Sequence, residues 1–284
     1  MKVAHLSTCH NCFDTRIFYK ECVELERLGY DVYLIAQHNK KETVKNIKII
    51  PLKRSYNRFF RMTVTMTEMI IKCIRVNADI YHIHDPELLL LARLLKYLGK
   101  VVIFDMHEEM PASILSKAWI HPKLRNTISV MYSKMEEKLL RDIPVIFAEH
   151  SYAKKYRFKQ TEIILNYPQL SNFRNIKEDK YDIPSIGYLG DVTENRGILT
   201  ILEAIIILEK YGIFLNFECI GNIESKTSEV IKKKTKLINK SKIYLRGRVN
   251  LPEALKIMSK CHIGLCVLKD TPNSRHSYPT KLFE

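Results

Sequence analysis

Short apolar runs alternate along this chain with longer stretches in which hydrophobic residues recur at helical spacing. Residues 2–7 form one apolar run and residues 31–36 form the next. Between them, hydrophobic side chains recur every three to four positions up to the turn residue Gly29, at Phe18, Cys22, Leu25 and Leu28. This order predicts a strand, a helix and a second strand, the unit from which parallel sheets are built.

The alternation continues to the middle of the chain. Further strands are predicted where Val, Ile and Phe cluster, at 80–84, 101–104, 144–147 and 163–165, and helices are predicted at 87–98 and around 125–141. Strands separated by helices in this way indicate an α/β fold with a parallel, doubly wound sheet.

One predicted helix, over residues 58–76, is amphipathic. Its apolar face is made by Met62, Met66, Met69, Cys73 and Val76. Basic side chains gather on another face. The favoured interpretation is that the methionine face packs against the sheet. Contact between the basic helix and an anionic membrane stays open as an alternative.

The apolar periodicity stops at residues 169–183, which are rich in Asn, Lys and Asp, and then begins again. We interpret this segment as a linker between an N-terminal domain, residues 1–168, and a second domain, residues 184–284. The second domain has predicted strands at 186–190, 214–220, 243–245 and 263–268, and a helix over 198–208. Two Rossmann-like domains are therefore expected. The second is expected to be incomplete, because four strands fall short of the usual five or six.

Polar residues follow the predicted strands of the first domain at their carboxyl ends. They occupy residues 7–16, Asp85-Pro86, residues 105–108 and residues 166–168. In open parallel sheets the ligand binds outside the carboxyl ends of the strands. These four segments are therefore expected to form one ligand-binding cleft.

The net charge of +15 raises the question of a nucleic-acid partner. The excess is +9 up to Leu170 and +6 after it, so it is spread along the chain. A dedicated nucleic-acid site concentrates its basic residues on one element. The charge therefore favours anionic substrates or an anionic membrane surface over nucleic acid.

Localisation and metal content are also constrained. No apolar run approaches the length of a membrane span, and polar residues follow the first run at once, so we expect a cytoplasmic protein. The seven cysteines fit reduced thiols. Cys9 and Cys12 have the spacing of a metal-binding pair, with His5 and His10 nearby, but no second pair completes the site. No metal is expected.

Two segments of the second domain suit an anionic ligand. Residues 190–197, Gly-Asp-Val-Thr-Glu-Asn-Arg-Gly, join a predicted strand to a helix, so their backbone N–H groups would suit a phosphate. In residues 277–284, Ser-Tyr-Pro-Thr-Lys-Leu-Phe-Glu, a lysine and a glutamate begin a helix and would suit a phosphate and a vicinal diol. The alternatives are a turn with a solvated arginine and a capped surface helix.

Together these features resemble the family 4 glycosyltransferases, retaining enzymes of the GT-B fold that use nucleotide-sugar donors. The likeness covers the whole chain and is strongest for the branch that assembles cell-surface polysaccharide. Further stretches carry it, in order: His10, 14–18 (Asp-Thr-Arg-Ile-Phe), 28–32 (Leu-Gly-Tyr-Asp-Val), 83–86 (Ile-His-Asp-Pro), 105–108 (Asp-Met-His-Glu), 246–248 (Arg-Gly-Arg) and 261–265 (Cys-His-Ile-Gly-Leu).

The resemblance implies roles for individual residues. Arg196 and Lys281 would neutralise the donor diphosphate, beside Gly190 and Ser277, and Glu284 would hold the ribose hydroxyls. His107 would sit next to the transferring sugar and is a catalytic candidate together with Arg196 and Lys281. The acceptor side would be formed by Asp14, Arg16 and Asp85. From the residues alone, Asp14 and Asp85 are equally helix caps, Arg16 equally the partner of a carboxylate, and His107 equally a core histidine at a strand end.

The resemblance also implies co-substrates. They are a nucleotide sugar as donor and a glycan or lipid-linked sugar as acceptor, with no metal or other cofactor. Family members continue past the glutamate at position 284, so a C-terminal truncation is expected. The alternative is an inactive module that binds a nucleotide sugar or a partner.

Overall fold

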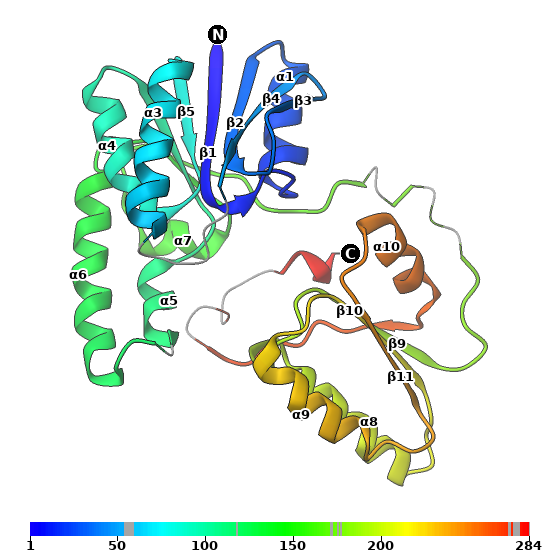
Figure 1. Ribbon diagram of the computed structural model, residues 1–284. Helices are drawn as coiled ribbons and strands as arrows, with labels where there is room; N and C mark the ends of the chain where they lie inside the picture. The colour runs from blue at the N-terminus through cyan, green and yellow to red at the C-terminus, as the bar shows by residue number, and fades with distance from the viewer. Residues whose placement is uncertain are drawn as a thin grey trace. The chain divides into compact units, whose positions relative to one another are not determined.

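The computed structural model describes residues 1–284 apart from 54–59, 118, 171–172, 175, 177, 272–273, 275–278 and 284. The chain divides into two compact units, Met1–Asn166 and Tyr167–Glu284, called unit 1 and unit 2 below. Each unit has its own sheet and its own hydrophobic core (Figure 1). Among the described residues, no helix combines the length and the apolar character that a membrane span requires.

Unit 1 is built on a sheet of eight described strands in the order β3-β4-β2-β1-β5-β6-β7-β8. Their bounds are β1 Lys2–Asn11, β2 Asp31–Gln37, β3 Glu42–Val44, β4 Ile47–Leu52, β5 Ile80–Ile83, β6 Val101–Met106, β7 Val145–Phe147 and β8 Thr161–Ile163. All neighbours pair in parallel except β3, which is antiparallel to β4. That hairpin was not predicted. Its two-residue turn, Lys45-Asn46, has positive φ at both positions, as such turns require.

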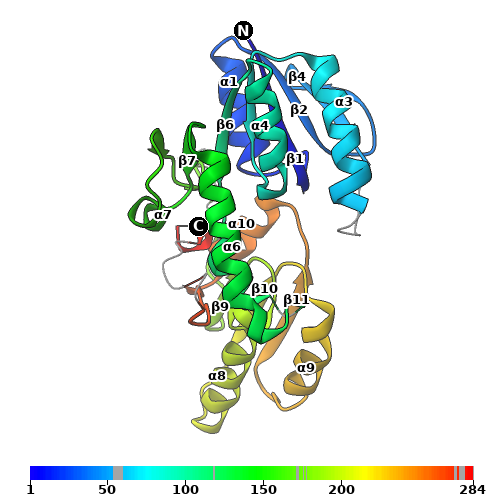
Figure 2. The ribbon, with the colours of Figure 1, turned by 90° about the vertical axis from the view of Figure 1, so that its left-hand side faces the viewer.

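Helices cover both faces of this sheet. Their bounds are η1 Ile17–Cys22, α1 Val23–Arg27, η2 Arg61–Thr65, α3 Met66–Val76, η3 Pro86–Leu88, α4 Leu89–Tyr97, α5 Met110–Ser116, α6 Pro122–Leu140 and α7 His150–Lys155. Figure 2 shows α3 and α4 in front of the sheet and α1 behind it. The first core cluster contains Met69 and Leu89 from α3 and α4, and a separate cluster packs Phe18 and Cys22 of η1 against β2 and β4.

Two of these helices differ in part from their predictions. The methionine face of the 58–76 helix is buried at Met69, Cys73 and Val76, as expected, whereas Met62 is exposed. Residues 58 and 59 lie outside the described residues. The helix expected to run to Gly29 ends at Arg27, so Leu28, the last of its recurring hydrophobic residues, lies in the turn and is 73% exposed.

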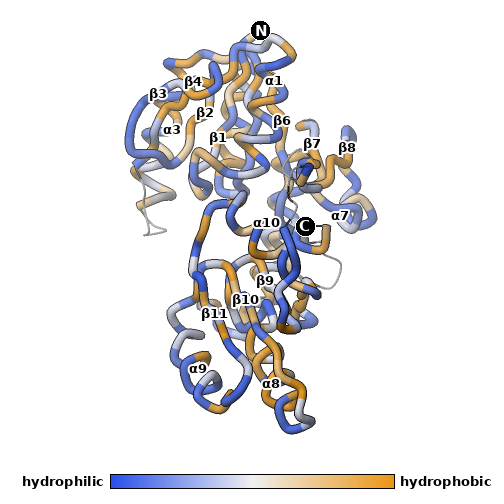
Figure 3. The backbone as a smooth tube through the Cα atoms, turned by 90° about the vertical axis from the view of Figure 1, so that its right-hand side faces the viewer, coloured by the Kyte–Doolittle hydropathy of each residue, from blue (hydrophilic) through white to orange (hydrophobic). Residues whose placement is uncertain are grey.

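Unit 2 has a four-stranded sheet in the order β11-β10-β9-β12, and all its described pairs are parallel. The strands are β9 Ser185–Leu189, β10 Asn216–Ile220, β11 Lys242–Gly247 and β12 Ile263–Gly264. The helices are η5 Glu194–Arg196, α8 Ile198–Lys210, α9 Ser225–Thr235, α10 Leu251–Lys260 and η6 Thr280–Leu282. The last strand is shorter than predicted. Helix α8 is hydrophobic along most of its length (Figure 3) and supplies Ile198, Ile201, Leu202 and Ile205 to the core.

Candidate functional site

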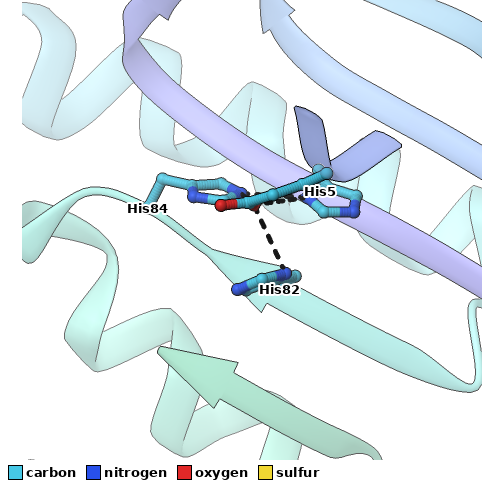
Figure 4. Close-up of side chains that lie close together, drawn as sticks. His5, His82 and His84 are labelled. Atoms are coloured by element: carbon cyan, nitrogen blue, oxygen red, sulfur yellow. Dashed lines mark hydrogen bonds and ion pairs between the residues drawn. The ribbon is translucent and has the colours of Figure 1, made fainter. Parts of the chain in front are cut away.

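The middle of the unit 1 sheet carries a row of polar side chains where hydrophobic ones are usual. His5 on β1 pairs in register with His82 on β5, and His84 lies two residues after His82. Residues in register, and residues two apart along a strand, point to the same face of a sheet. All three imidazoles are buried, and they lie side by side in Figure 4. Parallel strands buried on both faces are normally apolar, so this row suggests a function.

Asp105 of β6 extends the row and holds Arg16. The Nε and Nη2 atoms of Arg16 donate to the two carboxylate oxygens of Asp105, each at 2.8 Å, and Nη1 donates to the Ile164 carbonyl at 2.9 Å. Burial by itself raises the pKa of Asp105, but His107, His84 and Arg16 together hold it well below its usual range. Arg16 was predicted to line the acceptor side or to pair with a carboxylate, and the pairing is what the structure shows.

Asp14 places Arg16 by starting the helix that follows it. Its Oδ1 accepts hydrogen bonds from the backbone N–H groups of Arg16 and Ile17, at 2.9 and 3.0 Å. This is the capping role that short polar side chains play at the first turn of a helix. Although burial opposes the shift, hydrogen bonds from His10 and from this backbone lower the pKa of Asp14.

His107 lies where the polar row reaches the surface. Its Nε2 is 2.5 Å from Asp105 Oδ2 and 3.3 Å from His84 Nδ1, and its side chain is 19% exposed. An ionised carboxylate only accepts hydrogen bonds, so His107 Nε2 carries the proton in this pair. His107 is thus a partly accessible histidine oriented by a buried aspartate, rather than a core histidine.

The Asp85 side chain holds the carboxyl-terminal half of β1. Its Oδ2 accepts from Ser7 Oγ at 3.0 Å and from the backbone N–H groups of Thr8 and Cys9 at 2.5 and 3.0 Å. Its side chain makes no capping hydrogen bond to η3, so the alternative prediction of a helix cap is wrong for this residue. The Oδ1 atom lies 3.5 Å from His10 Nε2.

His10 is a candidate site residue to which the sequence assigned no role. Its Nδ1 lies 3.4 Å from Asp14 Oδ2, and its ring centre is 5.7 Å from that of His107. Burial disfavours the charged imidazole, but the carboxylates of Asp14 and Asp85 raise the pKa of His10 above its usual value. The four-residue spacing of His10 and Asp14 in a loop was the available signal. Unit 1 therefore brings Asp14, Arg16, Asp85 and His107 together.

Unit 2 brings together three of its predicted residues at the carboxyl end of β9. Gly190 adopts φ +126°, and a β-carbon placed on it would lie 3.4 Å from Lys281 Nζ and 3.6 Å from Arg196 Nη1. Lys281 Nζ also lies 3.9 Å from the centre of the Tyr188 ring, a cation–π contact. Ser277 and Glu284 lie outside the described residues.

Two glycines next to these cations have no room for a larger side chain. Gly197, at φ +76°, precedes α8, and a β-carbon there would lie 2.3 Å from Val267 Cγ1. A β-carbon on Gly221, which follows β10, would lie 1.8 Å from the Gly190 carbonyl oxygen. Beside Lys281 is a cavity of about 520 Å³, and Leu189 and Leu282 are also among its lining residues.

Among the described residues, two overlapping groups of side chains have the composition of a metal site. One is His5, Glu21, His82 and His84, and the other is Glu21, His84, Asp105 and His107. Cys9 and Cys12 belong to neither. Burial raises the pKa of the Cys12 thiol to about 11, which disfavours the thiolate that a metal binds.

Several solved structures share this architecture. Sucrose-phosphate synthase from Thermosynechococcus elongatus matches with a TM-score of 0.69 and 14% identity, over 95% of this chain and 76% of that one. WaaG, a glycosyltransferase involved in lipopolysaccharide biosynthesis, matches with a TM-score of 0.66 and 12% identity, over 96% and 76%. HepE from Anabaena matches with a TM-score of 0.64 and 10% identity, over 97% and 76%. At such identities the likeness concerns the fold, and it confirms the predicted two-sheet α/β class of GT-B type.

A comparison with curated protein sequences found no match. The sequence profile of Glycosyltransferase Family 4, in contrast, matches residues 15–157, which include Arg16, Asp85 and His107. The match covers half of the chain and spans most of unit 1. This chain belongs to glycosyltransferase family 4.

Proposed function

We propose that this glycosyltransferase is a retaining enzyme that moves a sugar from a nucleoside diphosphate donor to a glycan or lipid-linked acceptor in cell-surface polysaccharide synthesis. The observation that carries the donor part is the convergence of Arg196 and Lys281 on Gly190. The two cations lie beside a glycine whose missing side chain leaves room for an anion. HepE, which shares the fold, was solved in complex with UDP and glucose.

The chemistry assigned to these two cations follows from the leaving group. Departure of a nucleoside diphosphate builds negative charge on the phosphate oxygens. Fixed cations stabilise that charge as it develops, without any need to reorganise. In this proposal Arg196 and Lys281 supply the positive charge, and the transfer step uses no metal ion. Ser277 and Glu284 keep their proposed contacts with the donor phosphate and ribose.

Unit 1 would supply the acceptor side and the surroundings of the transferring sugar. The Arg16–Asp105 pair fixes His107, which is partly exposed, and His10 lies close by between two carboxylates. We assign His107 to the transferring sugar, and Asp14, Arg16 and Asp85 to the frame of the acceptor site. Their hydrogen bonds hold the carboxyl-terminal half of β1, which carries His10, and the start of η1.

A panel of nucleotide sugars tests the proposal, with released nucleoside diphosphate and transferred sugar as readouts. Arg196→Ala and Lys281→Ala should each weaken binding of the diphosphate roughly 10- to 100-fold, because a hydrogen bond to a charged group contributes about 1.5–3 kcal/mol. Lys210→Ala, at the exposed end of α8, is the matched control and should leave binding unchanged. Unchanged affinity in all three variants contradicts the assigned donor site.

Two further outcomes separate the finer parts of the proposal. The anomeric configuration of the product, measured by NMR, should match that of the donor, and inversion would contradict the retaining mechanism. Binding of a nucleotide sugar without any transfer would support the alternative of an inactive binding module. Turnover should not depend on added Mg²⁺ or Mn²⁺.

We also propose that the protein works in the cytoplasm and rests on the inner face of the plasma membrane, where lipid-linked acceptors are reached. The net charge of +15 supports attraction to anionic lipid. Cosedimentation with vesicles containing phosphatidylglycerol, compared with pure phosphatidylcholine vesicles, tests this. Equal binding to both would contradict it. Duplex nucleic acid should not compete in a sequence-dependent way.

A further inference from the structure

Four side chains of unit 1, three buried histidines and one half-buried glutamate, converge on a single point. His5 comes from β1, His82 from β5 and His84 from the residue after β5, while Glu21 comes from helix η1, which covers this face of the sheet. Figure 4 shows the three imidazole rings converging from these neighbouring segments. One potential ligand atom from each of the four residues lies within 4.8 Å of all the others. We propose that this cluster is a binding site for one Zn²⁺ ion.

The separations between Glu21 and the three histidines are too long for hydrogen bonds. Glu21 Oε2 lies 3.7 Å from His5 Nδ1, 3.8 Å from His82 Nδ1 and 3.7 Å from His84 Nε2. A hydrogen bond between such atoms spans about 2.7–3.2 Å. The carboxylate oxygen therefore faces three ring nitrogens without bonding to any of them. His5 Nδ1 and His84 Nε2 are closer, at 3.0 Å, which a shared proton would also explain.

The same separations fit a metal ion better than a water molecule. A tetrahedral zinc site with bonds of about 2.0–2.1 Å places its ligand atoms about 3.4 Å apart. A water that bonds to four partners at about 2.8 Å would hold them about 4.6 Å apart. The three separations from Glu21 Oε2 and the one between His5 Nδ1 and His84 Nε2 run from 3.0 to 3.8 Å and bracket the zinc value.

Burial makes the facing carboxylate oxygen costly without a ligand. Glu21 Oε2 is buried and has no hydrogen-bond partner among the described residues. A buried polar atom without a partner costs about 1–3 kcal/mol. The other carboxylate oxygen of Glu21, Oε1, lies 3.0 Å from Arg16 Nε, so Oε2 is left to face the histidines. Zn²⁺ would satisfy Oε2 and the three facing nitrogens together.

The ligand types in the cluster suit a transition-metal cation. Neutral imidazole keeps the lone pair that a metal needs. Three imidazoles and one carboxylate are typical ligands for zinc, whereas calcium and magnesium prefer oxygen.

The second group of possible ligands, which includes Asp105 and His107, is a weaker candidate. Asp105 already accepts two hydrogen bonds from Arg16 and a third from His107. Three of the roughly four acceptor positions of this carboxylate are therefore occupied. A metal bound to the first group would instead fix Glu21 and His84, which are members of both groups, and so hold the hydrogen bonds around Asp105 in place. The site thus departs from the expectation that the protein contains no metal, and it assigns the ion a structural role.

Metal binding by the protein tests this directly. Protein freed of metal with a chelator should bind one Zn²⁺ per chain. With Co²⁺ it should show the visible bands of a tetrahedral site, without the near-ultraviolet band of a thiolate ligand. His82→Gln and Glu21→Gln should each lower the affinity at least 10- to 100-fold, the loss that even outer partners of a metal ligand cause. His38→Gln is the matched control, because His38 pairs with Glu42 at 2.5 Å outside the cluster.

Measurements of folding distinguish a lost metal site from a variant that does not fold. Circular dichroism should show native secondary structure for Glu21→Gln, and added Zn²⁺ should raise the unfolding midpoint of the parent protein and of His38→Gln but not that of Glu21→Gln. The proposal is overturned if the parent protein binds no Zn²⁺ at micromolar concentration. It is equally overturned if the cluster variants bind as the parent does, or if Cys9→Ser abolishes binding.

Discussion

We expect the buried carboxyl group of Glu136, on α6, to make the stability of unit 1 depend on pH. Its carboxyl is buried, with a relative exposure of 1%, and its Oε2 accepts a hydrogen bond from Tyr156 at 3.0 Å. Burial outweighs that hydrogen bond and raises the pKa of Glu136 from 4.5 to about 7. The folded protein therefore holds a proton that the unfolded chain releases at lower pH.

The sign and size of the effect follow from this difference. Below pH 4.5 both states carry the proton, and Glu136 imposes no penalty. Between pH 4.5 and about 7 the unfolded chain ionises while the folded protein does not, so stability falls by about 1.4 kcal/mol per pH unit. The total loss is about 3 kcal/mol, and it is complete above pH 7.

Glu136→Gln removes the titrating group and keeps a side chain of the same shape. The free energy of unfolding should be measured in urea at pH 5 and pH 8, by circular dichroism and by the fluorescence of Trp119, the one tryptophan of the sequence, which lies in unit 1. The difference in unfolding free energy between Glu136→Gln and the parent should grow by about 2.5 kcal/mol between the two pH values, because part of the total loss occurs below pH 5. Glu137→Gln, on the neighbouring exposed residue, is the control and should keep the parental pH dependence.

The comparison isolates Glu136 because His10 and Glu21 titrate equally in the parent and in both variants. If Glu136→Gln and the parent lose the same stability between pH 5 and pH 8, then the buried carboxyl does not bind its proton more tightly in the folded state. That result would refute the reasoning from burial.

Three further predictions concern single contacts, each measured as a change in the free energy of unfolding. Gly221→Ala should cost more than about 4 kcal/mol, because its β-carbon would lie 1.8 Å from the Gly190 carbonyl oxygen. Gly212→Ala, with φ +77° and open space around it, is the control and should cost about 1–2 kcal/mol. Equal costs would contradict this prediction. Arg246→Met should cost about 1–3 kcal/mol, because it removes the two hydrogen bonds of 2.8 and 3.0 Å that Arg246 donates to the buried Glu218. The double variant with Glu218→Gln should recover part of that loss. Asp14→Ala should cost about 1–2 kcal/mol through the lost helix cap, and NMR should show the pKa of His10 falling once its partner is gone.

Much of the fold followed from local periodicity. The short apolar runs of the sequence became strands because a run of four to six buried residues between turn signals suits a strand in a parallel sheet. The hairpin formed by β3 and β4 was missed because its first strand, Glu42–Val44, carries no apolar run and is defined by pairing alone. Leu28 was misplaced for a related reason: periodicity marks a helix face but does not decide where the helix ends.

The candidate site was predictable at the level of segments. Parallel strands bring their carboxyl ends to one edge of the sheet, so the segments around Asp14, Asp85 and His107 were expected to meet, and they do. The atoms that pair could not be predicted. Arg16 and Asp105 are 89 residues apart, and their bidentate contact depends on how η1 packs over the sheet.

The sequence by itself determined the alternation of strands and helices, the two-domain α/β class and the segments that carry polar side chains, because these depend on spacing along the chain. Only the tertiary structure decided that His5 lies beside His82 and His84 beneath Glu21. A period of two fixes the face to which a strand residue points, but its neighbour depends on strand order and register, which arise from long-range packing.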